Sequence, residues 1–433
     1  MMNSPTFKQV LSQQAFSTQE LLECLQSFNH VVFLNNNHQP IIGFSAQHSV
    51  LIQQTQLHFS STKFKSLNDF FNASLNTQEP CLTMGFVSYD YAVNQQVQTQ
   101  TKPQPSLFLG QFQHYLSFEN DAWYFNSFDT QVFNTFQEIE QLIQNKVSAK
   151  KLELQAPCQS RWNKTQYTNA FQKVQDYIVA GDCYQINLTQ EFIAQAKGTL
   201  LSTADAFWTL TNAPYAGYLR INEFELLSCS PELFIDFEAN KKIVTKPIKG
   251  TMPRYNDPIL DEQSKNTLKH SKKDQAENVM IVDLLRNDLS VYAKVGSVKT
   301  PKLFNIESFN QVHHMVSEIE ATLKEDVQPF DVLMSTLPGG SITGAPKIRA
   351  MQIIDELEQG ARGAYCGSMG YFNSDGTGSW NILIRSIQNF QNELSVWAGG
   401  GITIASDCDA EYQECFDKVD ALLNLLNTYY KPE

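Results

Sequence analysis

A run of strand-like segments between residues 215 and 249 constrains the fold of this chain more than any other part. Tyr215 to Ile221, Phe224 to Phe237 and Ile243 to Lys249 are rich in apolar and β-branched residues, and short polar turns separate them. Strands joined by such short turns run antiparallel, because parallel strands need a long crossover. The spacing therefore predicts an antiparallel, three-stranded segment that ends at Lys249.

The last of these strands leads into the stretch from Thr245 to Arg254. Gly250 suits a tight bend and Pro253 cannot continue a central strand, so we expect Lys249 at a strand end where the chain turns away. Burial there would lower the lysine pKa, because it disfavours the ammonium, and a neutral amine is a nucleophile or a base. For an isolated Lys-Gly pair, an exposed lysine is the commoner interpretation.

Strands and helices are predicted on both sides of this segment. Strand-like runs fill much of residues 31–128, and helical spacing from Thr165 to Ala180 stops at Gly181. A long helical zone is expected over residues 257–292, a strand over 312–319, strands over 364–372, 379–390 and 394–398, and a final helix over 409–430.

The pattern predicts an α/β (α+β) protein in which two β-rich halves form an antiparallel sandwich with helices outside. A linker near Pro157 separates a predicted N-terminal subdomain, residues 1–155, from a catalytic domain, residues 156–433. The site is expected in the cleft between the two β-rich halves.

Composition excludes several classes of function. The 433 residues carry a net charge of -13 and no basic block, which argues against a nucleic-acid partner. No apolar run approaches the roughly 20 residues that a membrane span needs. The eight cysteines form no Cys-x-x-Cys pair, which indicates reduced thiols and a cytoplasmic enzyme.

Two glycine-rich segments could present backbone amides to an anion. Residues 338–347 lead into a helix at Pro346 but lack the Lys-Ser/Thr of a nucleotide-binding P-loop. Gly399, Gly400 and Gly401 follow a predicted strand. A plain helix-entry turn and a β-bulge are the respective alternatives.

Paired carboxylates recur on two predicted helices. Asp274 and Glu277 share one helix face, as do Glu411 and Glu414, with Lys418 one turn further on. Each pair alone is more typical of a solvated surface. If the pairs converge, their oxygens suit one hard cation, and Mg²⁺ is the expected cofactor.

Several long motifs resemble the chorismate-utilising enzymes, the family of anthranilate, isochorismate, salicylate and aminodeoxychorismate synthases. The resemblance covers about residues 160–430 and rests on segments 247–251, 276–284, 286–289, 338–346, 399–402 and 411–414. Alanine is usual before the glycine at 250 in the first three activities, whereas lysine is typical of the aminodeoxychorismate synthase branch. The resemblance therefore implies amination of chorismate at C4.

The resemblance also implies residue roles. Lys249 is expected to attack C2 of chorismate, Glu232 of Ser-Pro-Glu to protonate the departing C4 hydroxyl, and His314 to lie beside C4. Gln185 replaces the lysine base of water-using members, which favours an amine nucleophile. Glu277 and Glu414 are expected to bind Mg²⁺, with Asp274 and Glu411 further out. Substrate contacts are expected from Thr251, Thr343, Tyr365, Arg385, Gly399, Gly400, Gly401 and Lys418.

No glutaminase signature is present, so the resemblance implies a separate glutamine amidotransferase subunit that supplies ammonia. Two alternatives stay open: anthranilate synthase component I, and a non-catalytic relative that binds chorismate or tryptophan. The first differs in its product, and the second predicts loss of the acidic residues.

Overall fold

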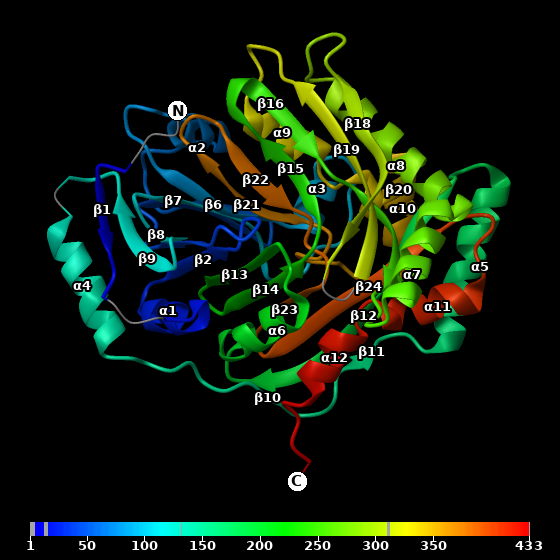
Figure 1. Ribbon diagram of the computed structural model, residues 1–433, viewed down its shortest axis with the longest axis horizontal. Helices are drawn as coiled ribbons and strands as arrows, with labels where there is room; N and C mark the ends of the chain where they lie inside the picture. Colours follow the sequence, from blue (N-terminus) through cyan, green and yellow to red (C-terminus); the bar gives the residue numbers. More distant parts are fainter. Residues whose placement is uncertain (1–4, 13–15, 131, 310–311, 433) are drawn as a thin grey trace.

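The computed structural model describes residues 5–12, 16–130, 132–309 and 312–432, and two large sheets with helices around them form its framework (Figure 1). The strands pair antiparallel throughout both sheets. The predicted fold class is therefore confirmed.

The first sheet has 13 strands. Its main path runs in the order β1 (Phe7–Val10), β9 (Ala122–Ser127), β8 (His114–Glu119), β3 (Ile41–Phe44), β2 (His30–Leu34), β13 (Tyr215–Ile221), β14 (Phe224–Ser230), β23 (Ser386–Phe390), β24 (Glu393–Ile402), β12 (Gln185–Lys197) and β10 (Glu153–Leu154). Two short strands, β11 (Gln159–Ser160) and β20 (Gly344–Ala345), also pair with β12.

The second sheet has 11 strands. Its path is β17 (Ile248–Pro253), β19 (Val312–Thr322), β16 (Lys242–Thr245), β15 (Leu233–Phe237), β22 (Gly378–Asn381), β21 (Ser368–Asn373), β6 (Leu82–Val87), β7 (Pro105–Phe112), β4 (His48–Gln53) and β5 (Gln56–Phe59), with β18 (Lys299–Ser308) beside β19. Strands from before and after residue 155 thus share both sheets, and the boundary there stays a prediction.

Helices flank these sheets (Figure 1). Gly181, at φ 82°, ends the fifth helix, as the sequence predicts, and Ser17 caps the first. They are α1 (Thr18–Cys24), α2 (Leu67–Ser74), α3 (Tyr89–Asn94), α4 (Phe133–Gln144), α5 (Lys164–Ala180), α6 (Ala204–Thr211), α7 (Pro258–His270), α8 (Lys272–Ser290), α9 (Pro329–Thr336), α10 (Lys347–Glu358), α11 (Cys408–Asp417) and α12 (Asp420–Asn427).

Two segments that the sequence predicts as single strands are each divided into two strands that belong to different sheets. The segment from Phe224 to Phe237 is two strands in different sheets, because Pro231 has no amide hydrogen to continue the ladder and the chain crosses between the sheets. Residues 379–390 likewise divide into β22 and β23, and Arg385 at the break has φ 50°. The crossings place Glu232 and Arg385 between the two sheets.

Three further expectations need correction. Lys249 does not end a strand, because β17 continues to Pro253, which is tolerated at the outer edge of the sheet. Gly399 to Gly401 do not follow a strand but lie inside β24, in regular register with β12. The final helix is broken near Val419 into α11 and α12.

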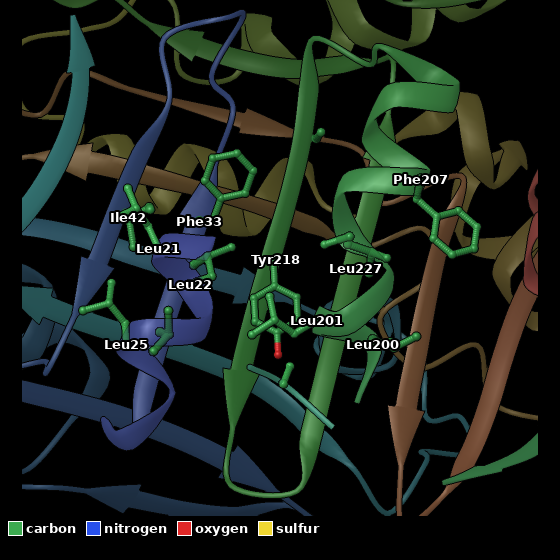
Figure 2. Close-up of a cluster of buried hydrophobic side chains, with 14 of the residues drawn as sticks. Leu21, Leu22, Leu25, Phe33, Ile42, Leu200, Leu201, Phe207, Tyr218 and Leu227 are labelled. Atoms are coloured by element: carbon green, nitrogen blue, oxygen red, sulfur yellow. The ribbon is translucent and has the colours of Figure 1, made fainter. Parts of the chain in front are cut away.

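Apolar side chains from distant parts of the sequence fill the space beside the first sheet. Figure 2 shows Leu21, Leu22 and Leu25, from α1 and the turn after it, beside strand residues Phe33 and Ile42. The same cluster includes Tyr218 and Phe207 from the second half of the chain. Burying each such side chain contributes roughly 1.5–3 kcal/mol, so residues on both sides of position 155 stabilise one core. Among the described residues, no helix is both long and apolar enough to cross a membrane.

Candidate active site

A cavity of about 750 Å³ collects most of the site residues expected from the sequence. This volume suits a small molecule rather than a macromolecule. The expected residues that line it are Glu232, Lys249, Thr251, Asp274, Glu277, His314, Tyr365, Arg385, Gly399, Gly401, Glu411, Glu414 and Lys418. They come from both sheets and from α8 and α11.

Lys249 lies in a bulge of β17. The register of β17 against β19 shifts between Ile248 and Thr251, and Gly250 within the shift has φ 88°. A Cβ at Gly250 would lie 2.9 Å from a side-chain atom of Asp274, so this glycine also lets β17 approach α8 closely. The Lys249 Nζ donates to the Ser341 carbonyl at 3.2 Å. Burial, followed by the charge of Lys418, lowers the pKa of Lys249.

Glu232 lies where the chain crosses between the sheets. Its Oε1 accepts from the Ile248 amide at 3.4 Å and from the Ser341 hydroxyl at 3.5 Å. Burial raises the pKa of Glu232 to about 7, although the charge of Lys249 acts in the opposite direction. A carboxyl group with that pKa can hold a proton near neutrality and donate it.

Two pairs of acids face the cavity from α8 and α11. Lys273 lies between them, with its Nζ 4.0 Å from the Glu277 Oε1 and 3.7 Å from the Glu411 Oε1. Burial raises the pKa of Glu277 and of Glu411. Burial acts likewise on Glu414, but Lys418, at 2.6 Å, outweighs it and the pKa of Glu414 is lowered.

The donor set of these helices suits a hard divalent cation, since every acidic side chain in it offers oxygen. As placed, however, no three His, Cys, Asp or Glu side chains of the described residues converge closely enough to hold a metal ion. The Lys273 ammonium supplies positive charge between the two pairs. A bound cation would therefore have to displace it.

Arg385 brings an unpaired positive charge to the cavity. Its guanidinium makes no hydrogen bond or ion pair with any residue in the described ranges, and burial lowers its pKa. A half-buried cation without a partner is only partly solvated, which favours an anionic ligand here. The fork of arginine can bond both oxygens of a carboxylate.

The two neighbouring histidines of β19 have different surroundings. Burial, followed by the charge of Arg385, lowers the pKa of His314 to about 3, so the ring is neutral, and its Nδ1 lies 2.9 Å from the Thr251 hydroxyl. His313 instead contacts Ser308 and Asp261, at 2.8 and 3.1 Å. It does not line the cavity.

Three of the expected residues do not reach the cavity lining. Gln185 is fully buried, neither atom of its amide has a partner in the described chain, and a side chain at Gly401 would collide with it. Thr343 donates to the Gly339 carbonyl. Gly400 faces the acids instead, since a Cβ there would lie 2.8 Å from the Glu411 Oε2.

Sequence reasoning missed several cavity residues. Lys273 had a readable signal, because a lysine four residues before Glu277 pairs with it on one helix face. Ser341 lies in the glycine-rich segment 338–347, but the sequence did not single it out, and Asn187 and Trp397 had no signal, since their places depend on how β12 and β24 meet.

A model of the family described as chorismate binding enzyme matches residues 27–424. The chain belongs to this family. The match reaches well into the N-terminal third, where the sequence motifs are less distinctive.

Individual members of the chorismate binding enzyme family are also similar. The chain is 48% identical over 268 residues to aminodeoxychorismate synthase component 1 of Salmonella typhimurium, and 47% identical over 268 residues to that of Escherichia coli. Each match covers 62% of this chain and 59% of the relative. The matched region thus spans less than two thirds of these curated relatives.

A solved structure shows the same fold. Anthranilate synthase component I from Streptococcus pneumoniae superposes with a TM-score of 0.77, over 88% of this chain and 91% of the other, at 24% sequence identity. The two-sheet architecture is therefore that of chorismate-utilising enzymes.

Proposed function

We propose that this protein aminates chorismate at C4 to give 4-amino-4-deoxychorismate, a precursor of p-aminobenzoate. The observation that carries the proposal is the Lys249 amine, whose pKa is lowered and which faces a cavity that also holds Glu232 and Arg385. The names of the Salmonella and Escherichia relatives support the same reaction.

The proposed chemistry uses Lys249 as a temporary nucleophile. Its neutral amine forms a bond to C2 of chorismate, both ring double bonds shift by one position, and the C4 hydroxyl leaves as water with a proton from Glu232. Ammonia then bonds to C4, both double bonds shift back, and the lysine leaves C2. Chorismate and ammonia are thus converted to 4-amino-4-deoxychorismate and water, and the enzyme is regenerated once Glu232 regains a proton.

Two positive groups are suited to the substrate carboxylates. Arg385 and the neighbouring Tyr365 would hold the enolpyruvyl carboxylate. Beyond Val396 the pairing of β24 with β23 stops, so Gly399 and Gly401 can meet the substrate along that edge. Lys418, which donates to the Gly399 carbonyl at 2.8 Å, contributes positive charge nearby. Neutral His314 would lie beside C4.

We further propose that Glu277 and Glu414 hold Mg²⁺, with Asp274 and Glu411 behind them. The metal would supply a positive charge for the ring carboxylate. The oxygen donors of these four acids, which all line one cavity, support this assignment.

The proposed ammonia source is a glutamine amidotransferase subunit, as the designation component 1 of the relatives suggests. Anthranilate synthase component I stays the alternative activity, and a non-catalytic relative is disfavoured by the complete acidic set. Incubation with chorismate, Mg²⁺ and ammonium separates these functions: aminodeoxychorismate keeps the enolpyruvyl group, whereas anthranilate is fluorescent and forms together with pyruvate.

Replacing Lys249 by Ala tests the covalent step. We expect Lys249→Ala to lose nearly all amination, because Lys273 and Lys418, which also line the cavity, are paired with glutamates. Wild-type enzyme trapped with substrate should carry an adduct on Lys249, which peptide mass spectrometry would detect. Lys246→Ala is the matched control. Lys246 lies three residues before Lys249 in the sequence and pairs with Glu318. Full activity of Lys249→Ala would exclude the mechanism.

Replacing Glu414 by Gln tests the metal ligands. The amide keeps the shape but loses the charge, so Mg²⁺ affinity and activity should fall together. Titration calorimetry with Mg²⁺ measures the first and product formation the second. A wild-type Mg²⁺ titration curve for the variant would show that the ligand assignment is wrong.

A further inference from the structure

A fully buried ion pair between Arg362 and Glu358 lies behind the cavity wall. Only 1% of each side chain is exposed. Glu358 is the last residue of α10, and the Arg362 Nε and Nη2 donate to its two carboxylate oxygens at 2.8 and 2.7 Å. Such a pair often stabilises a fold no better than apolar residues would, so its other contacts indicate what it does.

The same two side chains connect three separate segments. The Arg362 Nη1 donates to the Ile342 carbonyl at 3.0 Å, and the Nη2 to the Asn187 carbonyl at 2.7 Å. Glu358 accepts from the amide and hydroxyl of Thr189, at 2.8 and 2.7 Å. One ion pair thus joins the end of α10, the strand β12, and the short turn Gly340–Ile342.

This turn carries the carbonyl that accepts a hydrogen bond from the proposed nucleophile. Ser341 precedes Ile342, and its carbonyl accepts that bond from the Lys249 Nζ. The side-chain amide of Asn187 also donates to the Ile342 carbonyl, at 3.0 Å, so the peptide next to that acceptor is fixed from two sides. Ser341, Ile342 and Asn187 all line the cavity, whereas Arg362 does not.

We propose that Arg362 is a positioning residue that holds the Gly340–Ile342 turn so that the Ser341 carbonyl directs the Lys249 amine at the substrate. The inference deepens the function proposed above and rests on it. Lysine cannot replace Arg362, because a single ammonium cannot reach the Glu358 carboxylate and two carbonyls in different directions. Misplacement of a reacting group by about 1 Å can reduce a rate by about 100-fold.

The test is the variant Arg362→Lys, which keeps the positive charge but loses the planar set of guanidinium donors. We expect kcat for amination to fall by about 10- to 100-fold, with a smaller change in KM. In the absence of chorismate, a small acylating reagent at one fixed pH should modify Lys249 faster than in the wild type, because the amine has lost its acceptor. Peptide mass spectrometry measures that rate. Slower turnover with faster acylation is the signature of lost positioning.

Controls separate positioning from general damage. Lys347, half-buried on α10 and paired with Asp288, is the internal reference, since local unfolding would speed its acylation as well. Arg349 lies on the same helix, α10, and pairs at the surface with Asp182. Arg349→Lys should change neither turnover nor the acylation of Lys249. Glu358→Gln removes the charge of the partner and should reproduce the effect on Lys249, and it carries the test if Arg362→Lys does not fold.

The proposal is overturned if turnover falls while the acylation of Lys249 relative to Lys347 stays at the wild-type value. It is equally overturned if Arg362→Lys retains full kcat. Failure of the proposed function looks different, because the wild-type enzyme would then form no aminodeoxychorismate while the acylation comparison would still report on the position of Lys249.

Discussion

Lys249 shows how a local irregularity can place a reactive side chain. In a regular strand at this sheet edge, its neighbours would pair with β19 without interruption, but the shift between Ile248 and Thr251 leaves two residues outside the register. Gly250 takes the left-handed conformation that this shift requires. The bulge, rather than a strand end, thus directs the amine toward the Ser341 carbonyl.

Glu232 gives a prediction about stability and pH. Its pKa rises from 4.5 in the unfolded chain to about 7 in the fold, so the folded protein binds this proton more tightly. Its contribution to the free energy of unfolding therefore falls as pH rises from about 4.5 to 7. Glu232→Gln cannot ionise, and we expect its melting temperature to fall less than that of the wild type between pH 5 and 8.

Calorimetry across that pH range measures the effect. The control Glu238→Gln changes an exposed glutamate near the end of the following strand, and should follow the wild-type curve. Parallel pH curves for Glu232→Gln and wild type would contradict the raised pKa.

At the scale of elements, two helices that are far apart in sequence present acids to one cavity. The sequence already places Asp274 with Glu277 and Glu411 with Glu414 on single helix faces. The fold brings the two acid pairs to one cavity and places the Lys273 ammonium between them. This lysine and a divalent cation would compete for the same carboxylates.

The variant Lys273→Met should therefore bind Mg²⁺ more tightly than the wild type. Removing the tethered cation leaves the acids uncompensated, which strengthens their attraction for a metal ion. Titration calorimetry without chorismate gives the affinity directly. Lys272→Met is the matched control, because the neighbouring lysine points its Nζ to Gln275 instead. Equal or weaker Mg²⁺ binding by Lys273→Met would refute the competition.

At the scale of the whole molecule, the N-terminal residues are structural partners of the cavity-bearing half. β2 pairs with β13 in one sheet and β6 with β21 in the other. One hydrophobic cluster combines Val32, Phe86 and Phe108 with Leu219 and Met369. Removing the N-terminal residues would expose both the strand edges and the apolar side chains.

A fragment of residues 156–433 is therefore expected not to fold alone. It would lose β2 beside β13 and β6 beside β21, and unpaired apolar edges associate with other chains. Expression followed by thermal unfolding tests this, with the full chain as the reference. A soluble fragment with one cooperative transition would contradict the expectation and would support a domain boundary near residue 155.

Local chemistry explains which elements could be predicted. Gly181 and Ser17 fix helix boundaries through contacts within a few residues, and the pair β13 and β14 follows from alternation and a short turn. Pro231 is a sequence signal for a strand break, but nothing near Pro231 or Arg385 indicated that the chain changes sheets there. The alternation is similar on both sides of such a crossing, and only the packing of two sheets decides it.

The sequence by itself determined the antiparallel architecture, the residue types of the site and the family resemblance, because these depend on periodicity, chemistry and motifs along the chain. The tertiary structure alone decided that Lys249 lies in a bulge, that Lys273 separates the acid pairs, and that Gln185, Thr343 and Gly400 do not line the cavity. Each of these depends on contacts between segments far apart in sequence, and local residue preferences carry no information about such contacts.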